Sequence, residues 1–396
     1  MFLLPLICLL QNDVADSTRT NPYELSRFAT VFDASDQHLV GLTPAKELAV
    51  WDATTGQLVH VLKGNSEPII RGRLSPNGKW VLGQTLDPQT DSATWGLDGK
   101  PPRDRSMRLW DIKTGKVRWR IPNAFFDALS RDGRRIYGVE ARVSPNIEKP
   151  KLSCWDLATG RKVFTMPKFV PFGFLSNIVE ESADGRRLLY ADRIGTRVFD
   201  LTTRKQLVFL DSFSSQLSVF RSALTAAGDA FFFAGPEGAG AISLISIPSG
   251  RLIQKMSFPS IRANHIAKGA YDTDGIVWLP KAVGFIAIGD GGLYSFRRGE
   301  RLVTHRRVAH GGGYGGLIMS PNEESFAMWT VREEDQIKSF SISGYNTKTF
   351  TKFWDKPGLP IVCLPSGELV IEDRDTVRFV DMATGRELRA VRREGY

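Results

Sequence analysis

Short apolar runs alternate with turn-forming residues along almost the whole chain, and no long stretch keeps the 3.6-residue apolar spacing of a helix. Runs of about four to eight apolar and β-branched residues are typical of strands when Gly, Pro, Asn and Asp bound them. One example is Lys79–Leu82, which directly follows the turn Ser75–Gly78. The pattern therefore predicts an all-β protein with almost no helix beyond the N-terminal leader.

A seven-residue pattern recurs along the chain and marks the units of an internal repeat. Its clearest copies are Val50–Gly56, Leu109–Gly115 and Cys154–Gly160, each containing Trp-Asp followed by Thr-Gly. With weaker copies included, the Trp position falls at residues 51, 110, 155, 199, 245, 295, 341 and 380. The spacing averages about 47 residues, which is long enough for four strands per unit.

A second signature precedes the Trp-Asp pattern: a tight turn followed by a short strand-like run. Examples of the turn are Ser75–Gly78, Ser130–Gly133 and Ser182–Gly185. Asp or Asn with Gly suits such turns, because Gly adopts positive φ without steric cost. Each unit thus contains a strand, a hairpin turn, a strand, a loop, a strand ending at Trp-Asp, a Thr-Gly turn and a strand. This order is a four-stranded meander.

Both halves of the unit resemble the WD-repeat family, whose unit joins a Gly-His dipeptide, a Ser-Pro-Asp-Gly turn and a strand ending in Trp-Asp. The second unit matches best, with Gly64-Asn65 where the family has Gly-His. In the seventh unit, His310 precedes Ser320-Pro-Asn by the same ten residues. The resemblance implies a structural role for the repeat positions Trp51, Asp52, Trp110, Asp111, Trp155, Asp156, Asp200, Asp381 and His310.

The resemblance implies a single closed β-propeller of eight four-stranded blades, built from degenerate repeats. One twisted sheet cannot bury both of its faces alone, so the blades stack around an axis and the ring closes. The propeller domain is expected at residues 16–396, with repeat units at 27–63, 68–121, 124–166, 177–210, 218–258, 275–308, 314–354 and 359–393. A seven-bladed ring, with one terminal unit degraded into a cap, is the alternative.

The first ten residues, Met1–Leu10, are uninterrupted apolar, and the chain turns polar at Gln11. This pattern is typical of a signal peptide, although the first positive residue is Arg19 and a signal peptide usually begins with positive charge. The run is too short to cross a bilayer, which requires about 20 apolar residues. We expect residues 1–15 to direct export to the periplasm or the cell exterior, with a cytoplasmic protein as the alternative and no transmembrane segment.

The net charge of +9 comes from 52 basic and 43 acidic residues, and the basic residues occur as scattered pairs such as Arg134-Arg135. Nucleic-acid binding requires basic charge gathered on one face, so it is only a minor alternative. Cys154 and Cys363 each lie in an apolar run and are too few for a disulfide framework or a Cys-x-x-Cys metal pair. We expect two reduced thiols and no metal.

Two motifs resemble fragments of catalytic or metal sites but lack the remainder of those sites. His310–Gly313 resembles the oxyanion loop of lipases, yet the chain contains no Gly-x-Ser-x-Gly nucleophile elbow. Asp272–Gly275 resembles the start of a calcium loop, yet it lacks the third acidic position and the closing Glu. A loop and a turn between blades explain the two motifs.

The segment Asp111–Trp119 resembles the tryptophan-docking repeat of eight-bladed pyrroloquinoline-quinone dehydrogenases. In other units the residues that stand where this repeat has its Trp are His60, Phe164, Val208 and Arg389. One Trp among five positions, with no vicinal cysteine pair, makes a quinone-dependent enzyme or its relic the alternative function. The first expectation is a monomeric, non-catalytic scaffold without a cofactor that binds another protein.

The second unit carries an insertion that points to the partner-binding face. From hairpin turn to Trp position it takes 35 residues, 75 to 110, against 16 in the first unit. Long loops in compact domains are usually functional, and aromatic residues and Arg anchor interfaces. In a WD-type blade this loop and the blade-to-blade connections emerge on one face. Tyr314 is expected in a connection between two blades. The candidate partner-contact residues on this face are Trp95, Arg103, Arg105, Phe169, Phe172 and Tyr314. The alternative is a mobile insertion and a Phe cluster that fills the gap between two blades.

Overall fold

The computed structural model of the chain describes residues 31–65, 69–85, 106–130, 132–140, 151–166, 178–191, 195–211, 221–225, 227–234, 241–257, 276–279, 284–289, 292–298, 303–305, 313–334, 337–373 and 376–393. Within these ranges the chain forms strands β1 to β32 and no helix. The prediction of an all-β fold is confirmed.

The first four sheets are each built from four consecutive strands. Blade 1 contains β1 (Val31–Ala34), β2 (His38–Leu42), β3 (Leu48–Asp52) and β4 (Leu58–Val61). Blade 2 contains β5 (Ile69–Leu74), β6 (Trp80–Thr85), β7 (Ser106–Asp111) and β8 (Val117–Pro122). Blade 3 contains β9 (Ala124–Leu129), β10 (Arg135–Glu140), β11 (Lys151–Asp156) and β12 (Lys162–Thr165). Blade 4 contains β13 (Ile178–Glu181), β14 (Arg187–Ala191), β15 (Gly195–Asp200) and β16 (Lys205–Asp211).

The other four sheets follow the same plan. Blade 5 contains β17 (Arg221–Leu224), β18 (Ala230–Ala234), β19 (Ala241–Ser246) and β20 (Leu252–Ser257). Blade 6 contains β21 (Ile276–Leu279), β22 (Gly284–Gly289), β23 (Gly292–Arg297) and β24 (Val303–His305). Blade 7 contains β25 (Gly313–Met319), β26 (Ser325–Glu334), β27 (Ile337–Asn346) and β28 (Lys352–Pro357). Blade 8 contains β29 (Leu359–Cys363), β30 (Glu368–Asp373), β31 (Thr376–Asp381) and β32 (Glu387–Arg392).

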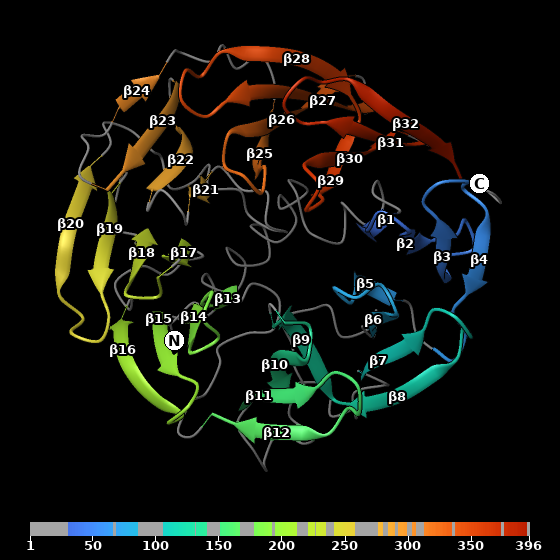
Figure 1. The fold of residues 1–396 in the computed structure, drawn as a ribbon, viewed down its shortest axis with the longest axis horizontal. Helices are drawn as coiled ribbons and strands as arrows, with labels where there is room; N and C mark the ends of the chain where they lie inside the picture. The colour runs from blue at the N-terminus through green and yellow to red at the C-terminus, as the bar shows by residue number, and fades with distance from the viewer. Residues whose placement is uncertain are drawn as a thin grey trace, which may run out of the picture.

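Figure 1 shows the eight sheets arranged around a common axis, with the first strand of each sheet nearest the axis and the fourth strand outermost. All strand pairs within a sheet are antiparallel, and each strand pairs with its neighbours in the sequence. The predicted eight-bladed β-propeller is therefore confirmed, and the seven-bladed alternative is wrong.

The middle strands of each blade are buried because neighbouring blades cover both of their faces. In blade 2, β6 and β7 are each buried at five of six positions, whereas the outer strand β8 has no buried position. A strand covered on both faces consists of nearly continuous apolar residues instead of alternating apolar and polar ones. This explains why the second and third strands of the repeat carry its strongest apolar runs.

The tryptophans of blades 1, 2 and 3 join each of these blades to the preceding one. Trp51, Trp110 and Trp155 occupy the same place in β3, β7 and β11, and each is at most 1% exposed. Trp110 packs against Val50 of blade 1, and its indole Nε1 donates to the backbone carbonyl of Lys63 at 2.8 Å. A buried indole N–H usually has such a partner. The Trp of the repeat thus contributes both apolar area and a hydrogen bond to the interface between blades.

Among the described strands, β1–β4 and β29–β32 form two separate sheets, so the first and last blades meet through side chains. Trp51 of blade 1 shares an apolar cluster with Phe379 and Val391 of blade 8. The guanidinium of Arg393 lies 5.5 Å from the Trp51 ring and donates from Nη2 to Glu372 Oε1 at 2.8 Å. The Arg393 side chain is fully buried. A buried ion pair therefore lies in the interface between the last blade and the first.

The strand register corrects the Trp position of two repeat units. In blade 6 the residue opposite Phe285 is Phe296, and in blade 7 the residue opposite Phe326 is Tyr345. The Trp positions expected at 295 and 341 therefore lie at 296 and 345. Tyr345 replaces the Trp, and Asn346 replaces the Asp and accepts the backbone N–H groups of the next turn. These replacements hid the motif of blade 7 from sequence comparison.

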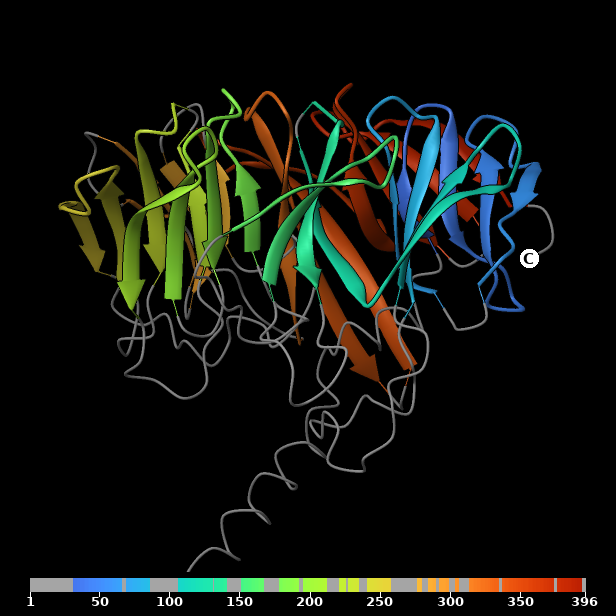
Figure 2. The ribbon, with the colours of Figure 1, turned by 90° about the horizontal axis from the view of Figure 1, so that it is seen from below.

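The two faces of the ring differ in the segments they carry. One face, the turn face, carries the turns between first and second strands, such as Ser75–Gly78, and those between third and fourth strands, such as Ala53–Gly56. The opposite face, the connection face, carries the loops between second and third strands, such as Thr43–Glu47, and the connections between blades, such as Gly358. Figure 2 shows the turns of the turn face along its upper edge.

Candidate partner-binding site on the connection face

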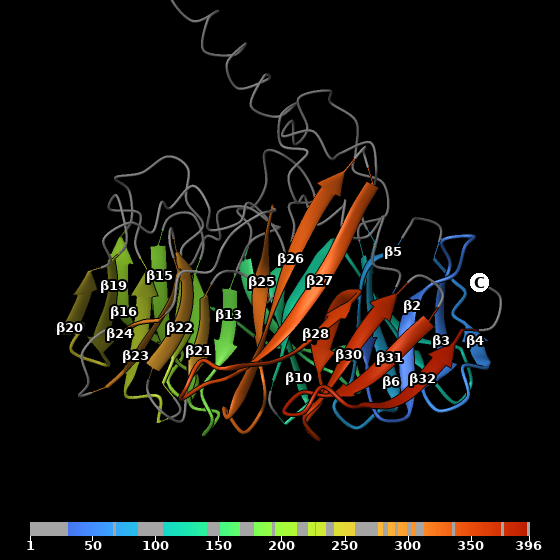
Figure 3. The ribbon, with the colours of Figure 1, turned by 90° about the horizontal axis from the view of Figure 1, so that it is seen from above.

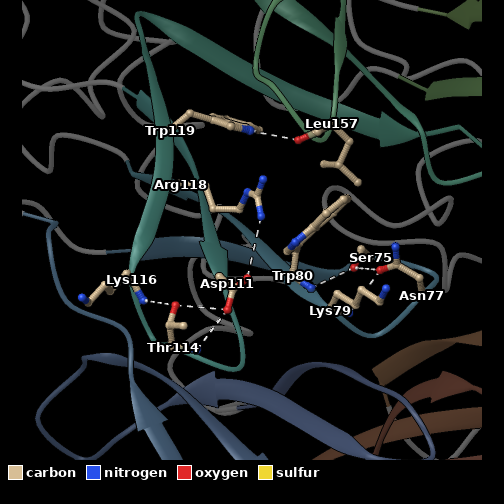
Figure 4. Close-up of polar contacts among 10 residues, drawn as sticks. All are labelled: Ser75, Asn77, Lys79, Trp80, Asp111, Thr114, Lys116, Arg118, Trp119 and Leu157. Atoms are coloured by element: carbon tan, nitrogen blue, oxygen red, sulfur yellow. Dashed lines mark hydrogen bonds and ion pairs between the residues drawn. The ribbon is translucent and has the colours of Figure 1, made fainter.

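On the turn face, the polar side chains of the repeat bond within their own turns (Figure 4). In blade 2, Asp111 Oδ1 accepts from the backbone N–H and the hydroxyl of Thr114, at 3.0 and 3.1 Å. The Ser75 hydroxyl donates to Asn77 at 2.7 Å and accepts from the Trp80 backbone N–H at 3.0 Å. Such local side chain to backbone bonds define a turn.

The other Asp residues of the repeat act in the same way. Hydrogen bonds from Thr55 and then Thr54 lower the pKa of Asp52, and a backbone hydrogen bond from Thr203 lowers the pKa of Asp200. The carboxylates of two further residues accept from the Thr three positions later; these residues are Asp156 and Asp381. In these four turns the Asp stabilises the turn that carries it.

One tryptophan of an outer strand docks onto the following blade. In blade 2, Trp119 Nε1 donates to the Leu157 carbonyl of blade 3 at 2.9 Å (Figure 4). Its ring lies so close to Gly160 that a Cβ there would be 2.8 Å from the Trp119 ring. Gly160 also has φ of +68°, which favours glycine. Trp119 therefore joins blade 2 to blade 3 by a hydrogen bond and by ring packing on Gly160.

Blade 7 contains a second docking tryptophan that the sequence comparison missed. Trp354 Nε1 donates to the Met382 carbonyl of blade 8 at 3.0 Å, and the ring packs on Gly385. Trp354 stands eight residues after Asn346, the same spacing as Trp119 after Asp111. The sequence pattern placed the Trp position of the seventh unit at 341 instead of 345, so the spacing that identifies Trp354 was not recognised.

Most of the sequence-predicted contact residues lie outside the described residues: Trp95, Arg103, Arg105, Phe169 and Phe172. The structural repeat position His310 also lies outside them. Tyr314 is described, and it lies within β25, the innermost strand of blade 7, opposite Thr330. Its placement in a connection between blades is therefore wrong. The β25–β26 pairing continues one residue beyond it, to Gly313 opposite Val331, so this part of the chain belongs to the sheet.

Beside Tyr314, blade 7 carries the most prominent feature of the connection face. Strands β26 and β27 have ten residues each, whereas every other described strand has three to seven. Pairing with β25 ends at Val331, and pairing with β28 ends at Ser341. Residues 332–334 and 337–339 therefore pair only with each other among the described strands. We call these two segments the rib; Figure 3 shows β26 and β27 extending past the other blades.

The base of the rib contains a buried donor. Trp329 is 5% exposed, and its ring lies 6.2 Å from that of Phe340. On β25 the register shifts between Tyr314 and Leu317, so a bulge with two glycines lies opposite Trp329. No acceptor for Trp329 Nε1 is present within the described ranges. Leaving a buried N–H donor without an acceptor costs about 1–3 kcal/mol. A residue outside these ranges that accepted a hydrogen bond from Trp329 Nε1 would remove this cost.

The two thiols in the body of the chain are both free. Cys154 lies on β11 of blade 3, and Cys363 lies on β29 of blade 8. Burial raises the pKa of each thiol to about 12. Because only the thiolate is nucleophilic, both should react slowly in the folded protein.

We therefore predict that iodoacetamide at neutral pH leaves Cys154 and Cys363 unmodified in the native protein and modifies both in denaturant without reductant. Peptide mass mapping of the two reactions is the measurement. Rapid native modification of Cys154, which lies in the core of blades 3 and 4, would contradict the packing.

The described part of the chain contains no group of three or more His, Cys, Asp or Glu residues placed to hold a metal ion. A search of the same residues for a helix long and apolar enough to cross a membrane found none.

Comparison with known proteins supports the fold and leaves the function open. No family model matches the sequence. No curated protein matches it either. A solved structure described as the crystal structure of the eukaryotic initiation factor is similar, with a TM-score of 0.52 and 14% identity. The match covers 90% of this chain and 96% of that chain. At this identity the likeness concerns the fold alone, so what the chain shares with solved structures is a propeller-like arrangement of β-sheets.

Proposed function

We propose that the protein is a non-catalytic propeller of the WD-repeat type that binds a partner protein through its connection face. The observation that carries the proposal is the rib, which extends blade 7 beyond the ring on that face. Among the described strands, pairing of blade 7 with β25 and β28 ends below the rib. Native proteins usually shorten or cover the edges of their sheets, so an extended hairpin favours a binding role.

The turn face supports the proposal by contrast. Its repeated Asp, Ser and Thr side chains bond within their own turns, as in Asp52 with Thr55 and Ser130 with Asp132. Recognition of a partner by these groups would first break those hydrogen bonds. The connection face instead carries the wide sequence interval between Thr85 and Ser106, and the rib. We therefore place the partner on the connection face.

Attaching a bulky polymer to one face at a time tests this placement. In a Cys8→Ser chain, Ala45→Cys places a thiol on the connection face of blade 1, and Thr54→Cys places one on its turn face. Both native residues are exposed, and the raised pKa values of Cys154 and Cys363 predict slow reaction of the native thiols. After coupling to a maleimide-polyethylene glycol, we expect the Ala45→Cys protein to lose most capture of partner from native extract.

The matched Thr54→Cys conjugate should capture as much partner as the uncoupled protein. Equal capture by both conjugates, or loss only at Thr54, would contradict a partner on the connection face. Circular dichroism of both conjugates checks that the fold is retained.

A second candidate, a quinone-dependent enzyme, is favoured by the two docking tryptophans, Trp119 and Trp354. The vicinal cysteine pair known in several of those enzymes is absent from this sequence, and Cys154 and Cys363 lie in blades 3 and 8. The two docking tryptophans lie on the outer strands β8 and β28, and their hydrogen bonds join neighbouring blades. An absorbance spectrum after incubation with pyrroloquinoline quinone and removal of the excess decides between the candidates, because a retained quinone band would favour the enzyme.

A further inference from the structure

Basic residues that are scattered along the sequence gather on one part of the turn face. The turns of blades 2, 3 and 4 on this face are residues 75–79, 111–116, 130–134, 156–161, 182–186 and 200–205. Eight exposed basic side chains belong to the described residues of these turns: Lys79, Lys113, Lys116, Arg134, Arg161, Arg186, Arg204 and Lys205. In the part of the chain that the structure describes, none of the eight forms an ion pair.

The repeat places six of these residues at two equivalent positions in each blade, directly after the residue of positive φ that ends the turn. The positions nearer the axis follow the turn between the first and second strands, and we call them the inner arc: Lys79, Arg134 and Arg186. The others follow the turn between the third and fourth strands and form the outer arc: Lys116, Arg161 and Lys205. Corresponding turns have equal length in the three blades, so these side chains leave the ring at a similar height, along the upper edge in Figure 2.

The acidic residues of the same turns are fewer, and their carboxylates are bonded within the turns. They are Asp111, Asp132, Asp156, Asp184 and Asp200, five against the eight basic residues. Asp132 Oδ1 accepts from the Arg134 backbone N–H, and Asp184 Oδ1 accepts from that of Arg186, each at 3.0 Å. Two further cations on the adjoining strands offset two of the carboxylates, since Arg118 lies 3.8 Å from Asp111 and Arg187 pairs with Asp200. The exposed charge of this part of the face is therefore positive.

The turns of blades 7, 8 and 1 have the reverse charge. They are residues 320–324, 346–351, 364–368, 381–386, 35–37 and 52–57. Lys348 and Arg386 are their basic residues, against six acidic ones: Asp36, Asp52, Glu323, Glu324, Glu368 and Asp381. Because the two parts of the face differ in sign, an anionic partner on the turn face is attracted to blades 2 to 4.

The shape and composition of the basic turns favour one class of anionic partner. The six turns contain no aromatic residue, whereas proteins that bind single-stranded nucleic acid stack its bases on aromatic side chains. Duplex nucleic acid is a narrow cylinder that would contact only part of two curved arcs. A bilayer surface requires only basic side chains that reach a common plane, and clusters of about four to eight Lys and Arg residues bind anionic headgroups.

We propose that the turn face of blades 2 to 4 binds the surface of a bilayer that contains anionic lipids. The inference goes beyond the proposed function, because it concerns the face opposite the one assigned to the partner protein. Headgroup phosphates contact the basic side chains of both arcs and leave the hydrogen bonds inside the turns intact. The attraction falls off within about 8 Å at physiological salt, so the basic turns lie against the headgroups and the acidic turns of blades 7, 8 and 1 tilt away.

Sedimentation with lipid vesicles tests the proposal with the full-length protein. We expect the protein to sediment with vesicles of equal parts phosphatidylglycerol and phosphatidylcholine, and to remain in solution with phosphatidylcholine alone. The double variant Lys116→Gln with Lys205→Gln removes one charge from blade 2 and one from blade 4. Each basic residue near an anionic bilayer contributes a factor of about five to binding, so the partition of this variant should fall about tenfold or more.

The double variant Lys46→Gln with Lys63→Gln is the matched control, because both lysines are exposed, lie on the connection face and carry the same charge. It should bind the mixed vesicles as the native protein does, and circular dichroism of both variants checks the fold. No binding of the native protein to the mixed vesicles, or equal losses in the two variants, would overturn the proposal. Duplex DNA that displaces the vesicles and binds more tightly through Lys116 and Lys205 would assign the basic turns to nucleic acid instead.

Discussion

Replacing Glu372 by Leu is expected to destabilise the protein by about 3–5 kcal/mol, because the change leaves the buried Arg393 guanidinium without its carboxylate. The pair lies in the interface between blade 8 and blade 1, against Trp51. The free energy of unfolding, measured by urea titration of tryptophan fluorescence, should fall accordingly. The effect is large because both side chains are almost fully removed from water.

The double variant Glu372→Leu with Arg393→Met is the control. Replacing both partners of a buried ion pair by apolar residues of similar size is often neutral or stabilising. We expect the double variant to recover most of the lost stability. A single variant as stable as the native protein would show that the pair contributes nothing to closure. A double variant no more stable than the single one would assign the loss to disturbed packing instead.

The second large effect is expected at a docking tryptophan. Trp354→Ala removes a buried ring and the hydrogen bond to Met382, so the free energy of unfolding should fall by about 3–5 kcal/mol. Trp354→Phe keeps most of the ring area and loses only the indole donor, so a smaller loss is expected. Urea unfolding of both variants is the measurement.

Leu252→Ala provides the matched control, because Leu252 also lies on an outer strand but is 56% exposed. Surface substitutions of this kind usually change stability by no more than about 0.5 kcal/mol. If Trp354→Ala and Leu252→Ala had equal effects, the contact with Gly385 would not contribute to the blade 7 to blade 8 interface.

The number of blades could be predicted from the sequence because the repeat depends on local chemistry. An Asp accepts from a Thr three residues later, and Gly supplies positive φ at the end of the same turn, as in Asp111–Gly115. These contacts lie within a few residues of one another, so they leave a readable pattern. The pattern became unreliable where other residues fill the same role, as with Tyr345 and Asn346 in blade 7.

The rib could not be predicted in this way. The rib begins where β25 stops pairing at Val331 and β28 stops pairing at Ser341. The positions of these two end points depend on contacts between distant parts of the chain. The sequence from Ser325 to Asn346 shows a long strand-like run with a charged middle, which is the signal that was available. The residues of the insertion around Trp95 lie outside those that the structure describes.

The contiguity of each blade has a consequence for how such a ring can change in evolution. Each of the sheets formed by the described strands consists of four consecutive strands, so each repeat unit encodes one of these sheets. Duplication or loss of one unit would therefore leave every remaining sheet complete and alter only the angle between neighbours. Blade number is then set by interface residues such as Trp51, Trp110 and Trp155, whose size fixes how far apart adjacent sheets stand. Substitutions at these positions could permit rings of a different size from the same unit.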